Sequence, residues 1–175
     1  MQIASRQPLW NEGGRGTVVE VNMTPATGLK FQLAVHYTKD QNLVVDWGDH
    51  SKTEHAYVDG DQLVPHTYAQ YGKYKIVVFG VRSIGLRFLD GQSQYSYDAA
   101  VISVVDYCGQ ITSSQSAAFK KAVNLERYIC PNCTWQGQRD FAYCSKLKEV
   151  VIGMNGICYD GTYQYCSSLE SYTTK

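Results

Sequence analysis

Cysteine is the residue type in this sequence with the most potential for chemistry. Six cysteines are present, and Cys130 and Cys133 have the Cys-x-x-Cys spacing of a redox pair or of half a zinc site. A complete zinc site needs a second pair of this kind, which Cys158 and Cys166 do not form. Free structural thiols are therefore the preferred interpretation, and a disulfide and zinc are the alternatives. Spacing alone assigns no disulfide.

Histidines and aspartates offer two further kinds of chemistry. A cysteine nucleophile with a histidine base is conceivable, but no local catalytic signature surrounds any cysteine. Asp46, Asp49, Asp59 and Asp61 could gather around a calcium ion, yet Asp59-Gly60-Asp61 is equally typical of a hairpin turn. We therefore predict a protein that is not an enzyme, with no catalytic residue, metal or cofactor.

The composition narrows the class of partner. Lys+Arg and Asp+Glu number 16 each among 175 residues, so the chain has no electrostatic footprint for nucleic acid or an anionic membrane. No apolar run approaches the roughly 20 residues that span a bilayer, and the N-terminus lacks the apolar segment of a secretory signal. Export would require a signal that has been removed or lies upstream.

The first half of the chain has the pattern of short strands. Residues 1–16 contain a glycine-rich run and are interpreted as a tail. From Thr17 onward, apolar and polar residues alternate over short segments such as Phe31–Tyr37, and turns rich in Gly and Asp separate them. This pattern predicts an antiparallel β-sandwich, which we place at residues 17–90.

Two motifs in this region resemble the signature of PKD-type domains, the seven-stranded sandwiches named after polycystic kidney disease protein. The segment Asp46–Asp49 (Asp-Trp-Gly-Asp) corresponds to the family's first turn, and His50 stands where a second glycine is usual. The segment His66–Tyr68, followed by Gly72-x-Tyr74, corresponds to the second motif. The resemblance covers about residues 17–82 and implies a PKD- or Ig-like sandwich, in which His66 bonds to a turn.

The second half of the chain repeats with a period of 22 residues. An aromatic residue, a small residue and a leucine recur at the same spacing in segments 119–128, 141–150 and 163–172. A fixed period of this length predicts a solenoid, whose units bury their apolar faces against one another. The three residues lie on one face of a short helix or helical turn, and the alternation that follows predicts a short strand.

The pattern Phe-x-x-Cys-x-x-Leu-x-x-Val-x-Ile at residues 141–152 resembles the BspA-like leucine-rich repeats of bacterial surface proteins. The resemblance covers about residues 101–175, and residues 91–100 are left as a connector. It implies that Cys144 and Cys166 fill a small buried position as free thiols. No capping unit follows Leu169–Thr174, so we predict that the natural chain continues past Lys175.

These patterns predict a mainly β protein in two parts, a PKD/Ig-like antiparallel sandwich followed by a short leucine-rich-repeat solenoid. The resemblances imply a non-enzymatic, secreted or cell-surface bacterial module that adheres to host or bacterial surface proteins or glycans through the solenoid strand face. The alternative is a structural assembly protein, of a phage or a surface appendage, that associates through the open solenoid edge. The predicted contact residues are the solvent-facing strand positions Arg127, Ile129, Glu149, Val151, Ser171 and Thr173.

Overall fold

The computed structural model describes residues 16–86, 96–153 and 157–175, and within them the chain is mainly β, as predicted. The one helix in these ranges is a five-residue 3-10 helix, η2 (Ser96–Ala100). None of the described residues forms a helix with the length and apolar character that a membrane crossing needs. The predicted tail at residues 1–16 lies outside the described residues except for Gly16, and so does the first half of the predicted connector.

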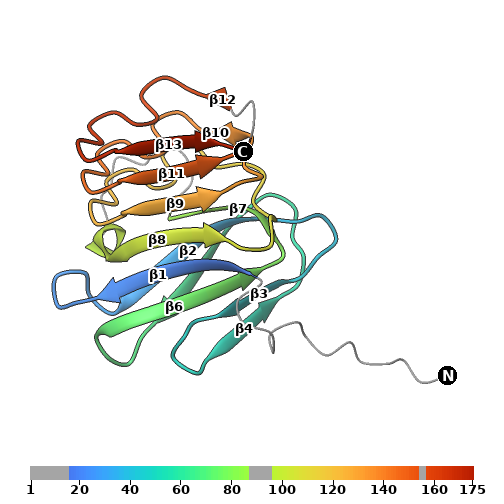
Figure 1. Ribbon diagram of the computed structural model, residues 1–175. Coiled ribbons are helices and arrows are strands. Elements are labelled where there is room, and N and C mark those ends of the chain that lie inside the picture. The colour runs from blue at the N-terminus through green and yellow to red at the C-terminus, as the bar shows by residue number, and fades with distance from the viewer. Residues whose placement is uncertain (1–15, 87–95, 154–156) are drawn as a thin grey trace.

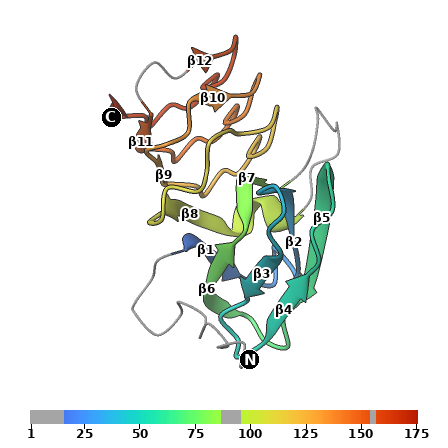
Figure 2. The ribbon, with the colours of Figure 1, turned by 90° about the vertical axis from the view of Figure 1, so that its right-hand side faces the viewer.

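The first seven strands form two antiparallel layers. Residues at alternating positions pack between the layers, as Val19, Val21 and Met23 of β1 do, because successive side chains of a strand point to opposite faces. One layer is a sheet of order β5-β2-β7, and Figure 2 shows β5 and β2 on the opposite side of the sandwich from β1. The strands are β1 (Thr17–Met23), β2 (Lys30–Tyr37), β3 (Leu43–Asp46), β4 (Lys52–His55), β5 (Asp61–Thr67), β6 (Gly72–Phe79) and β7 (Val81–Gly85).

Strand β8 (Val101–Asp106) joins this sandwich to the second half of the chain. One edge of β8 pairs antiparallel with β1, and its other edge pairs parallel with β9 (Arg127–Cys130). Strands β11 (Glu149–Ile152) and β13 (Ser171–Thr174) continue the parallel arrangement. The result is one eight-stranded sheet of order β13-β11-β9-β8-β1-β6-β3-β4, which fills the front of Figure 1 from top to bottom.

The repeats of the second half form successive coils behind β9, β11 and β13. Phe119, Phe141 and Tyr163 stack with ring centroids 5.6 and 5.5 Å apart and with nearly parallel planes. The residues around each ring form hydrogen-bonded turns rather than helices. Two short parallel strands, β10 (Trp135–Gln136) and β12 (Ile157–Cys158), link neighbouring coils. The 22-residue period thus coincides with the step from one coil to the next.

The backbone conformation of the coils repeats with the same period. Lys121, Tyr143 and Tyr165 occupy equivalent places and have φ values of 66°, 67° and 62°. This left-handed conformation costs a non-glycine residue about 1–2 kcal/mol. It is maintained because the amides of Lys121 and Tyr143 donate to carbonyls of the next coil, those of Ala142 and Gln164.

A continuous hydrophobic core connects the sandwich and the coils. At their junction the buried carboxylate of Asp106 accepts hydrogen bonds from the Thr17 hydroxyl (3.1 Å) and the Ile111 amide (2.8 Å). Gln110 donates through Nε2 to Thr17 Oγ1 (2.7 Å) and to the Val78 carbonyl (2.8 Å). These bonds tie β8 and the loop after it to β1 and β6. The division into a domain at 17–90 and another at 101–175 stays a prediction.

Candidate functional site

The six predicted contact residues form two rows across the parallel part of the large sheet. One row is Arg127, Glu149 and Ser171, and the other is Ile129, Val151 and Thr173. Both rows lie on the face turned away from the coils, because the alternating residues Tyr128 and Val150 are buried in the coil interior. Val151 is only 6% exposed, whereas its neighbour Ile129 is half-buried.

The strand register continues both rows into the sandwich. Ser103 of β8, Glu20 of β1 and Lys75 of β6 extend the first row, and Val105, Val18 and Val77 extend the second. We call Lys75, Glu20, Ser103, Arg127 and Glu149 the charged row. We call Val77, Val18, Val105, Ile129 and Val151 the aliphatic row, and the two rows together the outer face.

Sequence reasoning missed the sandwich half of this surface. The alternation of Val18 and Glu20 with buried neighbours was a visible signal that they point away from the sandwich core. No signal in the sequence showed that β1 pairs with β8, and this pairing places Val18 and Glu20 beside the parallel strands of the second half.

The charges of the outer face are paired within the chain. Nε of Arg127 lies 2.8 Å from Oε2 of Glu149, and Nζ of Lys75 lies 3.3 Å from Oε1 of Glu20. The Ser103 hydroxyl donates to Oε2 of Glu20 at 2.9 Å. The charged row therefore alternates in sign along the sheet and carries no net charge.

The central strands of the outer face line a shallow depression of about 410 Å³. Its lining consists of the members of both rows from β6, β1 and β8, together with Arg127 and Tyr107. Tyr107 is 63% exposed and is the one aromatic side chain in this lining. The surface therefore offers contiguous aliphatic carbon beside paired charges.

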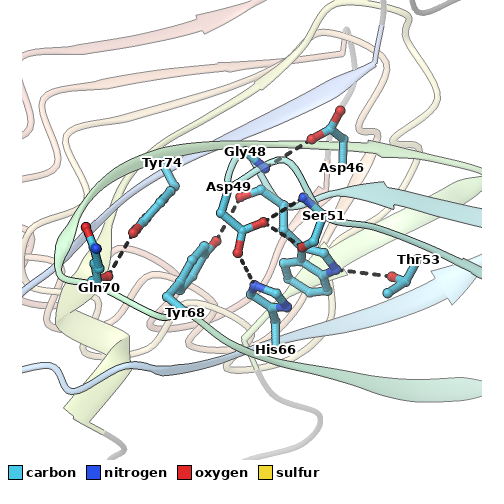
Figure 3. Close-up of polar contacts among 10 residues, drawn as sticks. Asp46, Gly48, Asp49, Ser51, Thr53, His66, Tyr68, Gln70 and Tyr74 are labelled. Atoms are coloured by element: carbon cyan, nitrogen blue, oxygen red, sulfur yellow. Dashed lines mark hydrogen bonds and ion pairs between the residues drawn. The ribbon is translucent and has the colours of Figure 1, made fainter.

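A second polar cluster connects the two PKD-like motifs, as Figure 3 shows. Nε2 of His66 lies 2.8 Å from Oδ2 of Asp49, and the Ser51 hydroxyl donates to Oδ1 of the same carboxylate at 2.5 Å. The His66 ring stacks on Trp47 with centroids 4.4 Å apart. Tyr68 donates its hydroxyl to the Trp47 carbonyl at 3.1 Å. His66 therefore bonds to the turn that contains Asp49.

This cluster has the residue types of a hydrolytic triad but not its arrangement. In a triad the histidine lies between the serine and the carboxylate and takes the serine proton, whereas here Asp49 lies between Ser51 and His66. Burial raises the pKa of Asp49, but hydrogen bonds from Ser51 and His66 outweigh burial and hold this pKa below its ordinary value. Because Ser51 donates to a carboxylate rather than to a histidine, the cluster stabilises the turn instead of activating a nucleophile.

The four aspartates considered as calcium ligands each have a different partner. Asp46 pairs with Lys52 (3.1 Å), Asp49 with His66, Asp61 with His36 (3.2 Å), and Asp59 accepts a bond from Tyr57 (3.4 Å). Among the residues that the structure describes, no group of three or more His, Cys, Asp or Glu side chains could hold a metal ion.

All six cysteines are free thiols in the structure. Burial raises the pKa of Cys133 to about 12 and the pKa of Cys130 well above its ordinary value, so neither is poised to act as a thiolate. Cys144 donates to the Phe119 carbonyl and Cys166 to the Phe141 carbonyl, both at 3.1 Å. The last two thiols thus make the same contact in successive coils. Cys144 is buried and Cys166 is half-buried.

One buried carboxyl group lies among the coils. Asp140 is fully buried and accepts a hydrogen bond at Oδ2 from the Ser114 hydroxyl. Burial raises the pKa of Asp140 to about 8, and the bond from Ser114 offsets the effect of burial only in part. Nothing in the sequence marked this residue, because an aspartate in a turn is ordinarily exposed.

Comparisons of this chain with protein families, with curated proteins and with solved structures found no match. Its function is therefore inferred from its own residues and their geometry.

Proposed function

We propose that this protein is a non-enzymatic binding module of a cell surface or extracellular space, and that the outer face is its contact surface. The observation that carries the proposal is the continuity of the aliphatic row across β6, β1, β8, β9 and β11. Val77, Val18, Val105 and Ile129 are each half-buried, so part of each side chain reaches the surface. Contiguous apolar surface bordered by polar groups is typical of interaction sites on soluble proteins.

The motif resemblances support the same class of function. A PKD-like sandwich followed by BspA-like repeats implies an adhesive surface protein, whose partners are surface proteins or glycans. The polar clusters support a role without catalysis, since Ser51 is bonded to a carboxylate and burial raises the pKa of Cys130 and Cys133.

The proposal is tested by binding of the immobilised protein to a panel of purified extracellular proteins and glycans. The double variant Val105→Asp/Ile129→Asp places carboxylates in the aliphatic row, so retention of any bound partner should fall at least about tenfold. The matched control is Leu63→Asp, because Leu63 is 52% exposed on β5 of the other sheet. Binding that survives the double variant but is lost with the control would overturn the proposal.

The edge strand β13 favours a second candidate function, that of a structural assembly protein. The amides of Phe141 and Tyr143 donate to carbonyls of the following coil. The amides of Tyr163 and Tyr165 occupy the equivalent places in the last coil. Within the described ranges, neither of these two amides donates to a backbone carbonyl. Tyr172 of β13 is also 43% exposed. An edge with free backbone groups is a template for another strand.

A proline substitution separates the two candidates. The amides of Ser171 and Lys175 donate toward β11, so the intervening amide of Thr174 points to the free edge. Thr174→Pro removes that donor without breaking a bond to β11. Assembly through the edge should be abolished by Thr174→Pro in sedimentation velocity, whereas binding through the outer face should be unchanged.

A further inference from the structure

We infer that the partner to which the outer face is complementary is a second copy of this chain, related to the first by a two-fold axis that lies in the interface and runs along β8. The inference rests on the proposed function, that the outer face is a contact surface, and names the partner of that surface.

The charged row is antisymmetric about Ser103. On one side of Ser103 stand Glu20 and then Lys75, and on the other side stand Arg127 and then Glu149. The sequence of charges from Lys75 to Glu149 is thus positive, negative, neutral, positive, negative. Reversal of this order exchanges every sign, so a two-fold axis through Ser103 brings opposite charges together.

The rotation defines which charges meet. Lys75 faces Glu149 of the partner subunit, and Glu20 faces Arg127 of the partner subunit. Because Lys75 is already paired with Glu20 and Arg127 with Glu149 within one chain, the two chains together form two four-membered networks of alternating sign. Such networks stabilise an interface more than isolated exposed ion pairs, which contribute little.

The same rotation superposes the aliphatic rows. An axis along β8 reverses the order of the strands but leaves positions along each strand unchanged, so the aliphatic row meets the aliphatic row. Val105 faces its own symmetry mate, while Val18 faces Ile129 of the partner subunit and Val77 faces Val151 of the partner subunit. Apolar area is therefore buried against apolar area at the centre, with charges beside it, as in isologous interfaces.

The ends of the aliphatic row are compatible with this arrangement. Thr173 of β13 follows Val151, and Asp46 of β3 follows Val77 at the opposite end. After rotation the Thr173 hydroxyl lies over Asp46 of the partner subunit, so a donor meets an acceptor.

The size of the surface predicts a weak dimer. Seven strands from β3 to β13 spaced about 4.8 Å apart span about 29 Å, and two rows of side chains cover about 15–20 Å along the strands. The contact area is therefore roughly 500 Å² per chain. This area is at the low end for specific interfaces, which predicts a micromolar dissociation constant. Two sheets packed face to face in this way lie about 10 Å apart with strands within about 30° of each other.

Other partners fit the outer face less well. A strongly charged partner such as nucleic acid would find each charge of the row already neutralised. A single-stranded nucleic acid would also need aromatic platforms for its bases, and the depression is lined by one aromatic side chain, Tyr107.

The inference is tested by two charge exchanges that each preserve the ion pair within the chain. The first variant is Arg127→Glu/Glu149→Arg, and the second is Glu20→Lys/Lys75→Glu. In a homodimer of either variant, like charges would meet at all four charged positions of the charged row. In a heterodimer of the two variants, opposite charges would again meet at all four charged positions.

Light scattering after size exclusion at about 100 µM measures the outcome. The wild-type protein should show a mass rising toward twice the 19.6 kDa of one chain, each variant alone should be monomeric, and the equimolar mixture should again form dimers. The quadruple variant, which carries both exchanges, should dimerise like the wild type. Circular dichroism spectra of the variants check that each is folded.

Each result also distinguishes this inference from the proposed function. A monomeric wild type, or a dimer unaffected by the exchanges and abolished by Thr174→Pro, overturns the inference. If a monomeric wild type still loses panel binding in Val105→Asp/Ile129→Asp, the outer face remains a contact surface for another partner. If the mixture restores dimers but no panel member binds, self-association stands and heterologous binding fails.

Discussion

His50 lies in the turn between β3 and β4 and has a left-handed backbone, with φ at 71°. Glycine adopts positive φ without steric cost, whereas a residue with a Cβ atom does not. His50→Gly should therefore raise the free energy of unfolding by about 0.5–1 kcal/mol, measured by urea denaturation. The matched control is Ala56→Gly, at an exposed position without positive φ, and this variant should have a lower free energy of unfolding. A loss of stability in both variants would contradict the prediction.

The second prediction at the scale of a residue concerns the buried carboxyl group of Asp140, which should make the free energy of unfolding depend on pH. Its pKa is about 8 in the folded protein, above the ordinary value of 3.8. At a pH between these two pKa values, the folded state retains a proton that the unfolded state has released. The contribution of Asp140 to stability is therefore present at about pH 4 and is lost as the pH rises through about 8. The slope is at most about 1.4 kcal/mol per pH unit.

Asp140→Asn should abolish this slope, because asparagine is neutral throughout. Urea denaturation at about pH 5 and about pH 8 should show a smaller difference for the variant than for the wild type, and a more stable variant at the higher pH. The exposed aspartate of the next coil supplies the control, since Asp160→Asn should leave the wild-type slope unchanged. Equal slopes in the wild type and Asp140→Asn would show that Asp140 is not a buried acid.

At the scale of the elements, the coils are held by the aromatic stack of Phe119, Phe141 and Tyr163. Phe141 is fully buried between the other two rings, whereas Tyr163 is half-buried at the end of the stack. Phe141→Ala should lower the free energy of unfolding by about 3–5 kcal/mol. Tyr163→Ala should lower it by only about 1–2 kcal/mol, because less area is lost. Equal losses in urea denaturation would mean that another coil or another chain covers Tyr163 in solution.

At the scale of the whole molecule, β8 makes the sandwich and the coils share one sheet and one core. We therefore expect a single cooperative transition. Asp106→Ala leaves the Thr17 hydroxyl and the Ile111 amide without their acceptor, so it should lower the free energy of unfolding by about 2–4 kcal/mol.

Hydrogen exchange at increasing urea measures whether both halves respond together. Peptides from β2 and from β11 should lose protection at the same urea concentration, and Asp106→Ala should shift both by the same amount. Loss of protection in β11 well before β2 would instead indicate two independent domains, as the sequence-based division at residues 17–90 and 101–175 predicts.

The local features could be predicted from the sequence, because they depend on spacing along the chain. Alternation over 31–37 shows one buried strand face, and the 22-residue period shows that equivalent residues stack in successive coils. Four members of the charged and aliphatic rows, Arg127, Ile129, Glu149 and Val151, were named from this period. The turn at Asp46–Asp49 and the bonding of His66 to a turn were also predicted from the two motifs, whereas the structure identified Asp49 as the partner of His66.

The pairing of β8 with β1 could not be predicted, because Thr17 and Asp106 are far apart in the sequence and nothing in their local pattern encodes the contact. That pairing joins the parallel strands β9, β11 and β13 to the sandwich in one sheet and aligns Glu20 and Lys75 with Arg127 and Glu149. The burial of Asp140 likewise depends on the coils that enclose it. Local periodicity thus set the direction of each side chain, whereas the register between distant strands set its neighbours, and the charge pattern of the outer face exists only in that register.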